Sequence, residues 1–208
     1  MGQTVRVIPA DVRSRYDAGV DALARSTSDF ASTRWAAPAC GVWNAEQLAG
    51  HVVGVIGWYH GWLDRALDGE VDRPFDPDDM DAQNERTLAS LSIDRGPARI
   101  EYFVDEARRY ADRVDEVEWD LPYGYPRGTV TVGGHFGGAA TVEWHVHAWD
   151  MSAGAHRPDD AGGLFLDAAD LHFFGTQSLV AGVQRRLAPL AAKRDPWRQI
   201  LRATGRRP

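Results

Sequence analysis

The chain has 208 residues, of which 44% are apolar and 25% charged, and its formal net charge is −7. This length suits one domain, or one domain with an extension, and is enough to bury a sizeable core. The acidic balance, without a lysine- or arginine-rich block, argues against a nucleic-acid binder, because phosphate contacts need clustered cations. Arginines gather only at the C-terminus, where we expect a solvated end: Arg202, Arg206 and Arg207.

Cysteine use and hydropathy predict a protein of the reducing cytoplasm. Cys40 is the single cysteine, so no disulfide can form within the chain, and we expect a small buried loop residue rather than a nucleophile. We find no signal peptide, and the longest apolar stretch, 52–62, is too short to cross a bilayer. We therefore expect no membrane partner, while the sequence leaves open whether the protein is a monomer or a homodimer.

Two amphipathic helices are predicted in the first third of the chain. Residues 11–32 place apolar side chains at helical spacing. These side chains are Val12, Tyr16, Val20, Leu23 and Phe30. A second helix over 44–67 has the best-defined start, with Asn44 as N-cap and Gln47 three residues later as its partner in a capping box.

Two further helices are predicted after an acidic, proline-containing loop. The first is short and covers 82–91. Pro97 then opens a long helix whose apolar residues recur at positions i, i+3, i+4 and i+7. This stripe consists of Ile100, Phe103, Val104, Ala107, Tyr110, Ala111 and Val114.

The rest of the chain is predicted to be mostly helical after a stretch rich in glycine and proline. Residues 118–134 form that stretch, which we interpret as a loop with a short strand at 129–132. A fourth long helix is expected over 135–153 and a fifth over 167–187. A last short helix is expected to end before Gly205.

These elements together predict an all-α protein. Four long amphipathic helices favour a four-helix bundle, which we place in residues 1–160. Residues 161–208 are expected to form a C-terminal helical extension packed on the same domain. The core of a bundle can hold a metal ion between side chains of facing helices.

Glu143 and His147 are the first candidate ligands. Residues four apart lie on one face of a helix, which allows both side chains to bind one ion, as in helical zinc motifs. The alternative is an ordinary surface pair worth a few tenths of a kcal/mol. The flanking Trp144 and Trp149 favour the metal, because a glutamate among large apolar side chains is costly unless it is paired. His145 points to the other side of the helix.

His51 is the candidate third ligand. It lies two turns into the second helix, on a face that also carries Trp58 and Trp62. The alternative is a core histidine with its hydrogen bonds satisfied. Sequence spacing does not show that His51 meets the other two ligands. Asp150, three residues after His147, could orient a ligand histidine by a hydrogen bond, or could simply lie near a helix end.

Four segments resemble the DinB-like, mycothiol-dependent maleylpyruvate isomerase family. The stretch 40–51, C-G-V-W-N-A-E-Q-L-A-G-H, resembles the family signature C-P-G-W-T-V-R-D-L-V-A-H, with Gly41 in place of proline. Residues 143–150 resemble its E-x-x-x-H-x-W-D helix, and 81–84 its D-x-x-N segment. The ending, 194–208, is similar to family C-termini that close on G-R-D-P.

The resemblance implies a DinB four-helix bundle that binds zinc through His51, Glu143 and His147. It also implies mycothiol, a thiol of actinobacteria, as cosubstrate. The ligand types suit several divalent ions, so zinc is an expectation rather than a deduction. The isomerase carries a further catalytic domain, and only a short segment follows the fourth helix here. We therefore predict a thiol S-transferase acting on a small electrophile. The alternatives are a cis–trans isomerase of the maleylpyruvate type, a non-catalytic metal- or ligand-binding bundle, and a metal-free helical protein.

Further site residues are expected around the ligands. Asp150 and Asn84 are the candidate catalytic residues. Five residues are expected to contact the cosubstrate or substrate: Trp58, Trp62, Tyr123, Tyr125 and Arg127. The last three belong to the glycine- and proline-rich stretch, which could equally be a plain connection.

Overall fold

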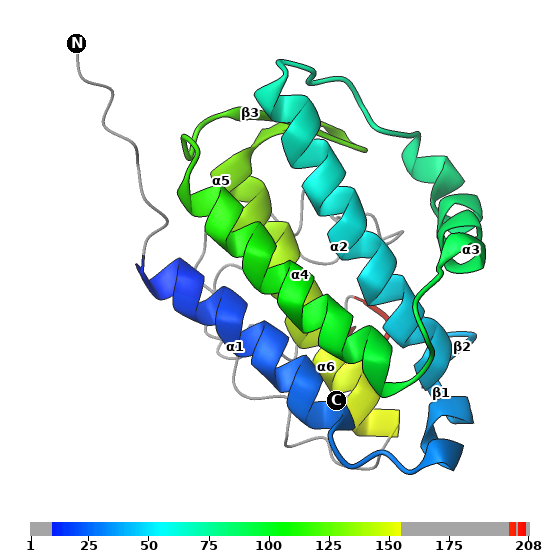
Figure 1. The fold of residues 1–208 in the computed structure, drawn as a ribbon. Coiled ribbons are helices and arrows are strands. Elements are labelled where there is room, and N and C mark those ends of the chain that lie inside the picture. The colour runs from blue at the N-terminus through cyan, green and yellow to red at the C-terminus, as the bar shows by residue number, and fades with distance from the viewer. Residues whose placement is uncertain (1–9, 155–199, 203, 207–208) are drawn as a thin grey trace.

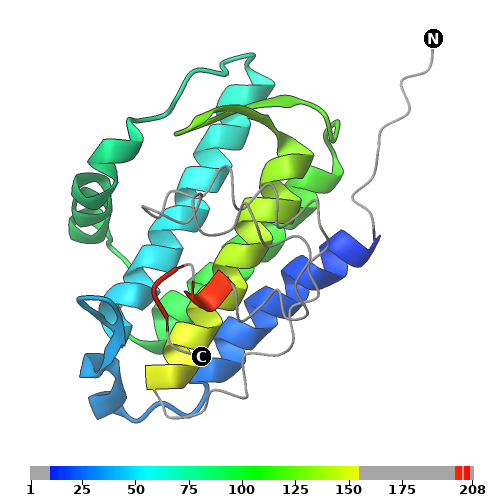
Figure 2. The ribbon, with the colours of Figure 1, turned by 180° about the vertical axis from the view of Figure 1, so that it is seen from behind.

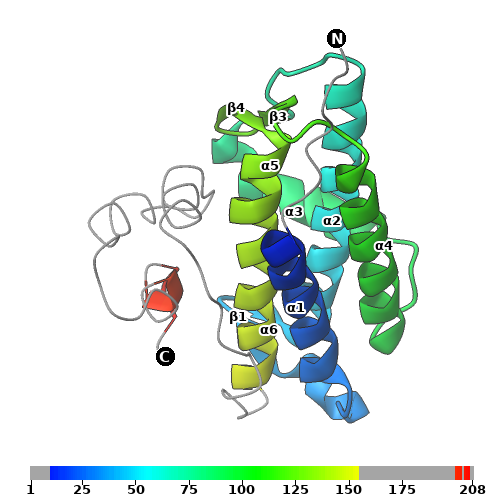
Figure 3. The same cartoon turned by 90° about the vertical axis from the view of Figure 1, so that its left-hand side faces the viewer.

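The protein is all-α, and the computed structural model describes residues 10–154, 200–202 and 204–206. Four long helical segments lie side by side (Figures 1 and 3). They are α1 (Ala10–Thr27), α2 (Ala45–Leu67), α4 (Pro97–Asp115) and a continuous run of α5 (Val132–Gly134), the π-helical η3 (His135–Ala140) and α6 (Thr141–Gly154). The predicted fifth helix and the predicted domain boundary lie outside the described residues. No helix in the described part of the chain is long and apolar enough to cross a membrane.

Shorter elements connect the long helices. Between α1 and α2 lie η1 (Ser32–Ala36) and the strands β1 (Pro38–Cys40) and β2 (Trp43–Asn44), which pair antiparallel. Between α2 and α4 lie η2 (Pro77–Asp79) and α3 (Met80–Ser90). After α4, β3 (Pro122–Tyr125) and β4 (Gly128–Thr131) form an antiparallel hairpin.

The start of α2 has the predicted capping box. Asn44 Oδ1 accepts a hydrogen bond from the Gln47 backbone N–H at 2.8 Å, and Gln47 Oε1 accepts one from the Asn44 N–H at 3.1 Å. Two backbone donors that the first helical turn leaves unpaired are thereby satisfied. The cap defines where α2, the helix that carries His51, begins.

The core lies where the long helices meet, and it is rich in aromatic rings. Tyr16 of α1 stacks on Phe136 with ring centroids 4.3 Å apart, and the fully buried Trp144 of α6 meets Phe103 of α4 edge to face at 4.8 Å. The predicted stripe of α4 is buried apart from Val104, which is partly buried. Gly19 lets α1 approach α6 closely, because a Cβ there would lie 2.8 Å from His145 Cδ2.

Two of the predictions for these elements are wrong. Helix α1 ends at Thr27 rather than near residue 32, and Phe30 instead packs on Trp35 with ring centroids 5.3 Å apart. The stretch predicted as a loop with one strand forms a two-stranded hairpin. Its first strand was missed because Gly124 weakens a strand signal. The glycine is needed there, since a Cβ would lie 2.4 Å from the Asp72 carbonyl oxygen.

Candidate metal centre

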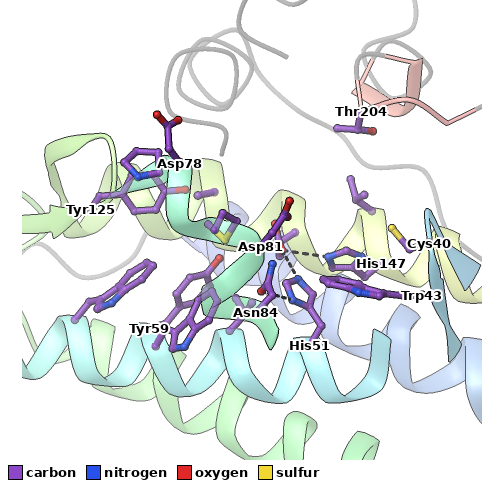
Figure 4. Close-up of a pocket in the computed structure, with 18 of the residues that line it drawn as sticks. Cys40, Trp43, His51, Tyr59, Asp78, Asp81, Asn84, Tyr125, His147 and Thr204 are labelled. Atoms are coloured by element: carbon purple, nitrogen blue, oxygen red, sulfur yellow. Dashed lines mark hydrogen bonds and ion pairs between the residues drawn. The ribbon is translucent and has the colours of Figure 1, made fainter. Parts of the chain in front are cut away.

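Three ligand side chains from two helices converge at one point. His51 comes from α2, and Glu143 and His147 come from successive turns of α6 (Figure 4). The Nε2 atoms of His51 and His147 lie 3.4 and 3.1 Å from the same oxygen, Glu143 Oε1. The three ligand atoms all lie within 4.8 Å of one another. The fold therefore brings together the three residues that the sequence singled out.

The spacing of these atoms fits a small divalent ion. With metal–ligand bonds of about 2.0–2.1 Å, neighbouring ligand atoms of a tetrahedral site lie about 3.3 Å apart. The two distances to Glu143 Oε1, 3.1 and 3.4 Å, fall on either side of this value. Two imidazoles and a carboxylate are also a ligand set that zinc accepts. The residues present thus fit the ion that the family resemblance implies.

Each ligand histidine is oriented by an acceptor on its second ring nitrogen. His51 Nδ1 donates to Asn84 Oδ1 of α3 at 3.1 Å, and His147 Nδ1 donates to Asp150 Oδ2 at 3.0 Å. These hydrogen bonds leave both Nε2 atoms directed at Glu143. A hydrogen-bonded acceptor behind a histidine is the usual arrangement at metal sites, because it selects the tautomer and holds the ring. Asn84 and Asp150 therefore lie next to the ligands, in orienting positions.

The electrostatics of the cluster favour a cation among the three side chains. Burial opposes ionisation of Glu143, but its contacts with the imidazoles of His147 and His51 hold the pKa of its carboxyl well below the usual range. Burial lowers the pKa of His51. Burial also acts to lower the pKa of His147, but Asp150 and Glu143 together raise it to about 9. A neutral His51 with its proton on Nδ1 turns a lone pair toward a carboxylate oxygen, and a bound cation would satisfy both acceptors.

The C-terminal arginine Arg206 belongs to this cluster. Its Nε and Nη2 donate to the two oxygens of Asp150 at 2.6 and 2.5 Å, and Nη2 also lies 3.2 Å from Cys40 Sγ. The expectation of a solvated C-terminal end is therefore wrong for Arg206. Charge runs are usually solvated, and a local pattern gives no sign that a buried aspartate far away in sequence will pair with one of them.

A cavity of about 520 Å³ opens beside the ligands. Figure 4 shows Tyr125 and Asp78 at one end and Trp43, Cys40 and Thr204 at the other, with His51 and Asn84 between them. The predicted Trp58 and Trp62 line its wall. Other lining residues were not singled out as site residues: Cys40, Trp43, Tyr59, Asp78, Asp81 and Arg206. Of these, Asp81 carried a signal, because it opens the segment that resembles the family's D-x-x-N.

Tyr123 and Arg127 are not among the residues that line this cavity. Tyr123 is fully buried, with its ring stacked on His135 at 4.6 Å and its hydroxyl donating to the Tyr59 carbonyl oxygen at 3.4 Å. Arg127 lies in the turn between β3 and β4. Of the three residues expected from this stretch, Tyr125, two residues after Tyr123 on the same strand, does line the cavity.

The ligand pair on α6 directly follows the π-helical segment η3. Thr141 Oγ1 donates to the Phe136 carbonyl oxygen, five residues earlier, at 2.8 Å. An extra residue in a turn rotates the helix that follows, and such segments are frequent at functional sites. Sequence periodicity gave no indication of this change in helical phase.

Comparison with known proteins identifies the family. The family model described as "Mycothiol maleylpyruvate isomerase N-terminal domain" matches residues 11–152, a range that contains the three ligands, Asn84 and Asp150. No curated protein and no solved structure matches the chain. A match over more than half of the chain establishes membership, so this protein belongs to the DinB-like family of mycothiol maleylpyruvate isomerase N-terminal domains.

Proposed function

We propose that the protein is a zinc-dependent thiol S-transferase that joins mycothiol to a small electrophile. One observation carries the proposal: both ligand imidazoles direct Nε2 at Glu143, and each has its Nδ1 held by an acceptor. Three protein ligands leave one coordination position open, as in catalytic zinc sites. A bound divalent ion would there lower the pKa of the cosubstrate thiol.

The chain's own cysteine does not compete with the cosubstrate as nucleophile. Burial raises the pKa of Cys40 to about 12, so its thiol stays protonated at neutral pH. A thiol rather than a thiolate is a poor nucleophile. The sulfur that reacts would therefore come from the bound cosubstrate.

In the proposed reaction, the cosubstrate sulfur forms a bond to an electrophilic carbon of the second substrate. The bond from that carbon to its leaving group breaks, and the leaving group departs with the electron pair. The thiol proton ends in solvent or on the leaving group. One molecule of thiol is consumed for each product formed, which separates a transferase from an isomerase that regenerates its thiol.

The cavity wall supports an uncharged, apolar electrophile. Trp58 and Trp62 stack with ring centroids 6.1 Å apart, and both line the cavity together with the carboxylates Asp78 and Asp81. Among the described lining residues Arg206 is the one with a cationic group, apart from histidine, and it pairs with Asp150. A dicarboxylate of the maleylpyruvate type would meet like charge, whereas an aromatic group would bury apolar surface.

The proposal is tested by incubating the zinc-loaded protein with mycothiol and an uncharged benzylic halide or aryl epoxide. We expect one thiol lost per thioether formed, by thiol titration and mass spectrometry. The reaction should fail in His51→Gln and persist in His60→Gln, a control on the same helix that hydrogen-bonds the Glu106 carbonyl oxygen instead. Isomerisation of a cis-dicarboxylate without loss of thiol would instead support the isomerase, and zinc binding with neither reaction would support a non-catalytic bundle.

A further inference from the structure

The buried carboxylate of Asp150 has two cationic or hydrogen-bonding partners, His147 and Arg206. His147 Nδ1 lies 3.0 Å from Oδ2, and the Arg206 guanidinium forks onto both oxygens at 2.6 and 2.5 Å. Asp150 is 1% exposed. A carboxylate removed from water in this way needs its partners, because a buried charge that loses one is strongly destabilised. Arg206 therefore supplies a hydrogen-bond donor to each oxygen of this carboxylate and helps to hold it in place.

The chain positions Arg206 by a Schellman turn. Gly205 adopts φ 86°, the Gly205 N–H donates to the Arg202 carbonyl oxygen at 3.1 Å, and the Arg206 N–H donates to that of Leu201 at 2.8 Å. These are the two hydrogen bonds of that motif, and its left-handed residue is ordinarily glycine. Ile200 and Leu201 just before it are buried. Figure 2 shows this end of the chain, in red, in front of α6, and Arg206 bonds to Asp150 of that helix.

We infer that Arg206 is a positioning residue of the metal centre. By forking onto Asp150, it holds the carboxylate that accepts the His147 Nδ1 proton, and so keeps His147 Nε2 directed at the ion. The inference rests on the proposed metal centre and does not depend on thiol transfer. The inference makes Arg206, which lies outside the range that matches the family model, part of the site.

The guanidinium matters here as well as the charge. Arginine presents two parallel N–H groups that match a carboxylate, whereas a lysine ammonium reaches it as a point charge. Removal of a residue that orients a metal ligand typically costs 10- to 100-fold in metal affinity. Arg206→Gln should therefore weaken zinc binding by about 10-fold or more, and Arg206→Lys by less.

The test measures zinc affinity by competition with a chelator, and records the absorption spectrum of the cobalt-substituted protein. Arg202→Gln is the matched control, because Arg202 is an exposed arginine one turn earlier on the same segment. We expect Arg202→Gln to match the wild type in affinity and spectrum, and Arg206→Gln to differ in both. Asp150→Asn should lower the affinity as well, and adding Arg206→Gln to it should cause little further loss, since the arginine acts through Asp150.

A second cluster of potential ligands, Cys40, His147 and Asp150, gives a further control. Cys40→Ala should keep wild-type zinc affinity, because the ion is assigned to Glu143 and the two histidines.

Wild-type affinity in a folded Arg206→Gln protein would overturn the inference, as would full additivity of the Arg206 and Asp150 substitutions. If Arg206→Gln does not fold, Arg206→Lys provides the comparison. Wild-type affinity and spectrum in Arg206→Lys would show that Asp150 does not need the two parallel N–H donors of an arginine. Failure of the wild-type protein to bind zinc would overturn the metal centre itself, an outcome distinct from failure of this inference alone.

Discussion

His51 and Asn84 lie on different helices, and the Nδ1 atom of the histidine is 3.1 Å from the amide oxygen of the asparagine. Helix α3, which carries Asn84, lies against α2 near the site (Figures 1 and 4). The contact buries Asn84 to 7% exposure. Through this contact the short helix α3 supplies the hydrogen-bond acceptor that orients the ring of the candidate ligand His51.

Asn84→Ala should weaken zinc binding by about 10-fold, because His51 Nδ1 loses the acceptor that selects its tautomer. Chelator competition measures the change. Gln83→Ala is the matched control, since that amide accepts a hydrogen bond from Arg86 instead. Equal affinities in the two variants would contradict an orienting role for Asn84.

The metal-free protein should lose stability as the pH rises through about 9, the folded-state pKa of His147. In the unfolded chain a histidine titrates near about 6.5. The folded protein therefore holds a proton that the unfolded chain has lost between these two values. The stabilisation of the folded state by this proton is fully present below the unfolded-state pKa and disappears as the pH rises through the folded-state pKa.

Thermal unfolding of chelator-treated protein at a series of pH values measures this dependence. His147→Gln removes the titrating group and should flatten the curve over the same range. An unchanged pH dependence in that variant would show that another group is responsible.

Replacing the two aspartates that line the cavity, Asp78→Asn with Asp81→Asn, should shift the preference toward anionic electrophiles. Both side chains are exposed, so removal of their charge should change the relative rates for an anionic and an uncharged electrophile by roughly two- to five-fold. Competition between the two electrophiles in one reaction gives the ratio. Asp79→Asn removes a neighbouring charge that does not line the cavity, and should leave the ratio as it is. No change in the double variant would argue that these carboxylates do not select substrates.

Gly19→Ala should destabilise the fold by about 1–3 kcal/mol, as overpacking of a tight contact does. The new Cβ would lie 2.8 Å from His145 Cδ2 and 3.1 Å from Trp144 Cβ, where α1 meets α6. Urea unfolding measures the free energy. Gly57→Ala should have the opposite sign, a gain of about 0.5–1 kcal/mol, because a Cβ there meets nothing within 4 Å and alanine favours a helix. A neutral effect of Gly19→Ala would show that the helices can separate at low cost.

Features that depend on residues close in sequence were predictable. The capping box of Asn44 and Gln47 joins groups three residues apart, and the stripe of α4 repeats with the helical period. Glu143 and His147 share a face because they are four residues apart. Such features follow from helix geometry alone, which is the same in every protein.

The tertiary structure decided which of these distant side chains come into contact. Spacing could not show that His51 reaches Glu143, which lies 92 residues away, or that Arg206 reaches Asp150, 56 residues away. These contacts depend on how α2 packs against α6 and on the Schellman turn at Gly205. Spacing likewise could not show that Tyr125 lines the cavity and Tyr123 does not. The sequence by itself determined the helices and the ligand types, whereas the packing of distant side chains determined which of them form the site.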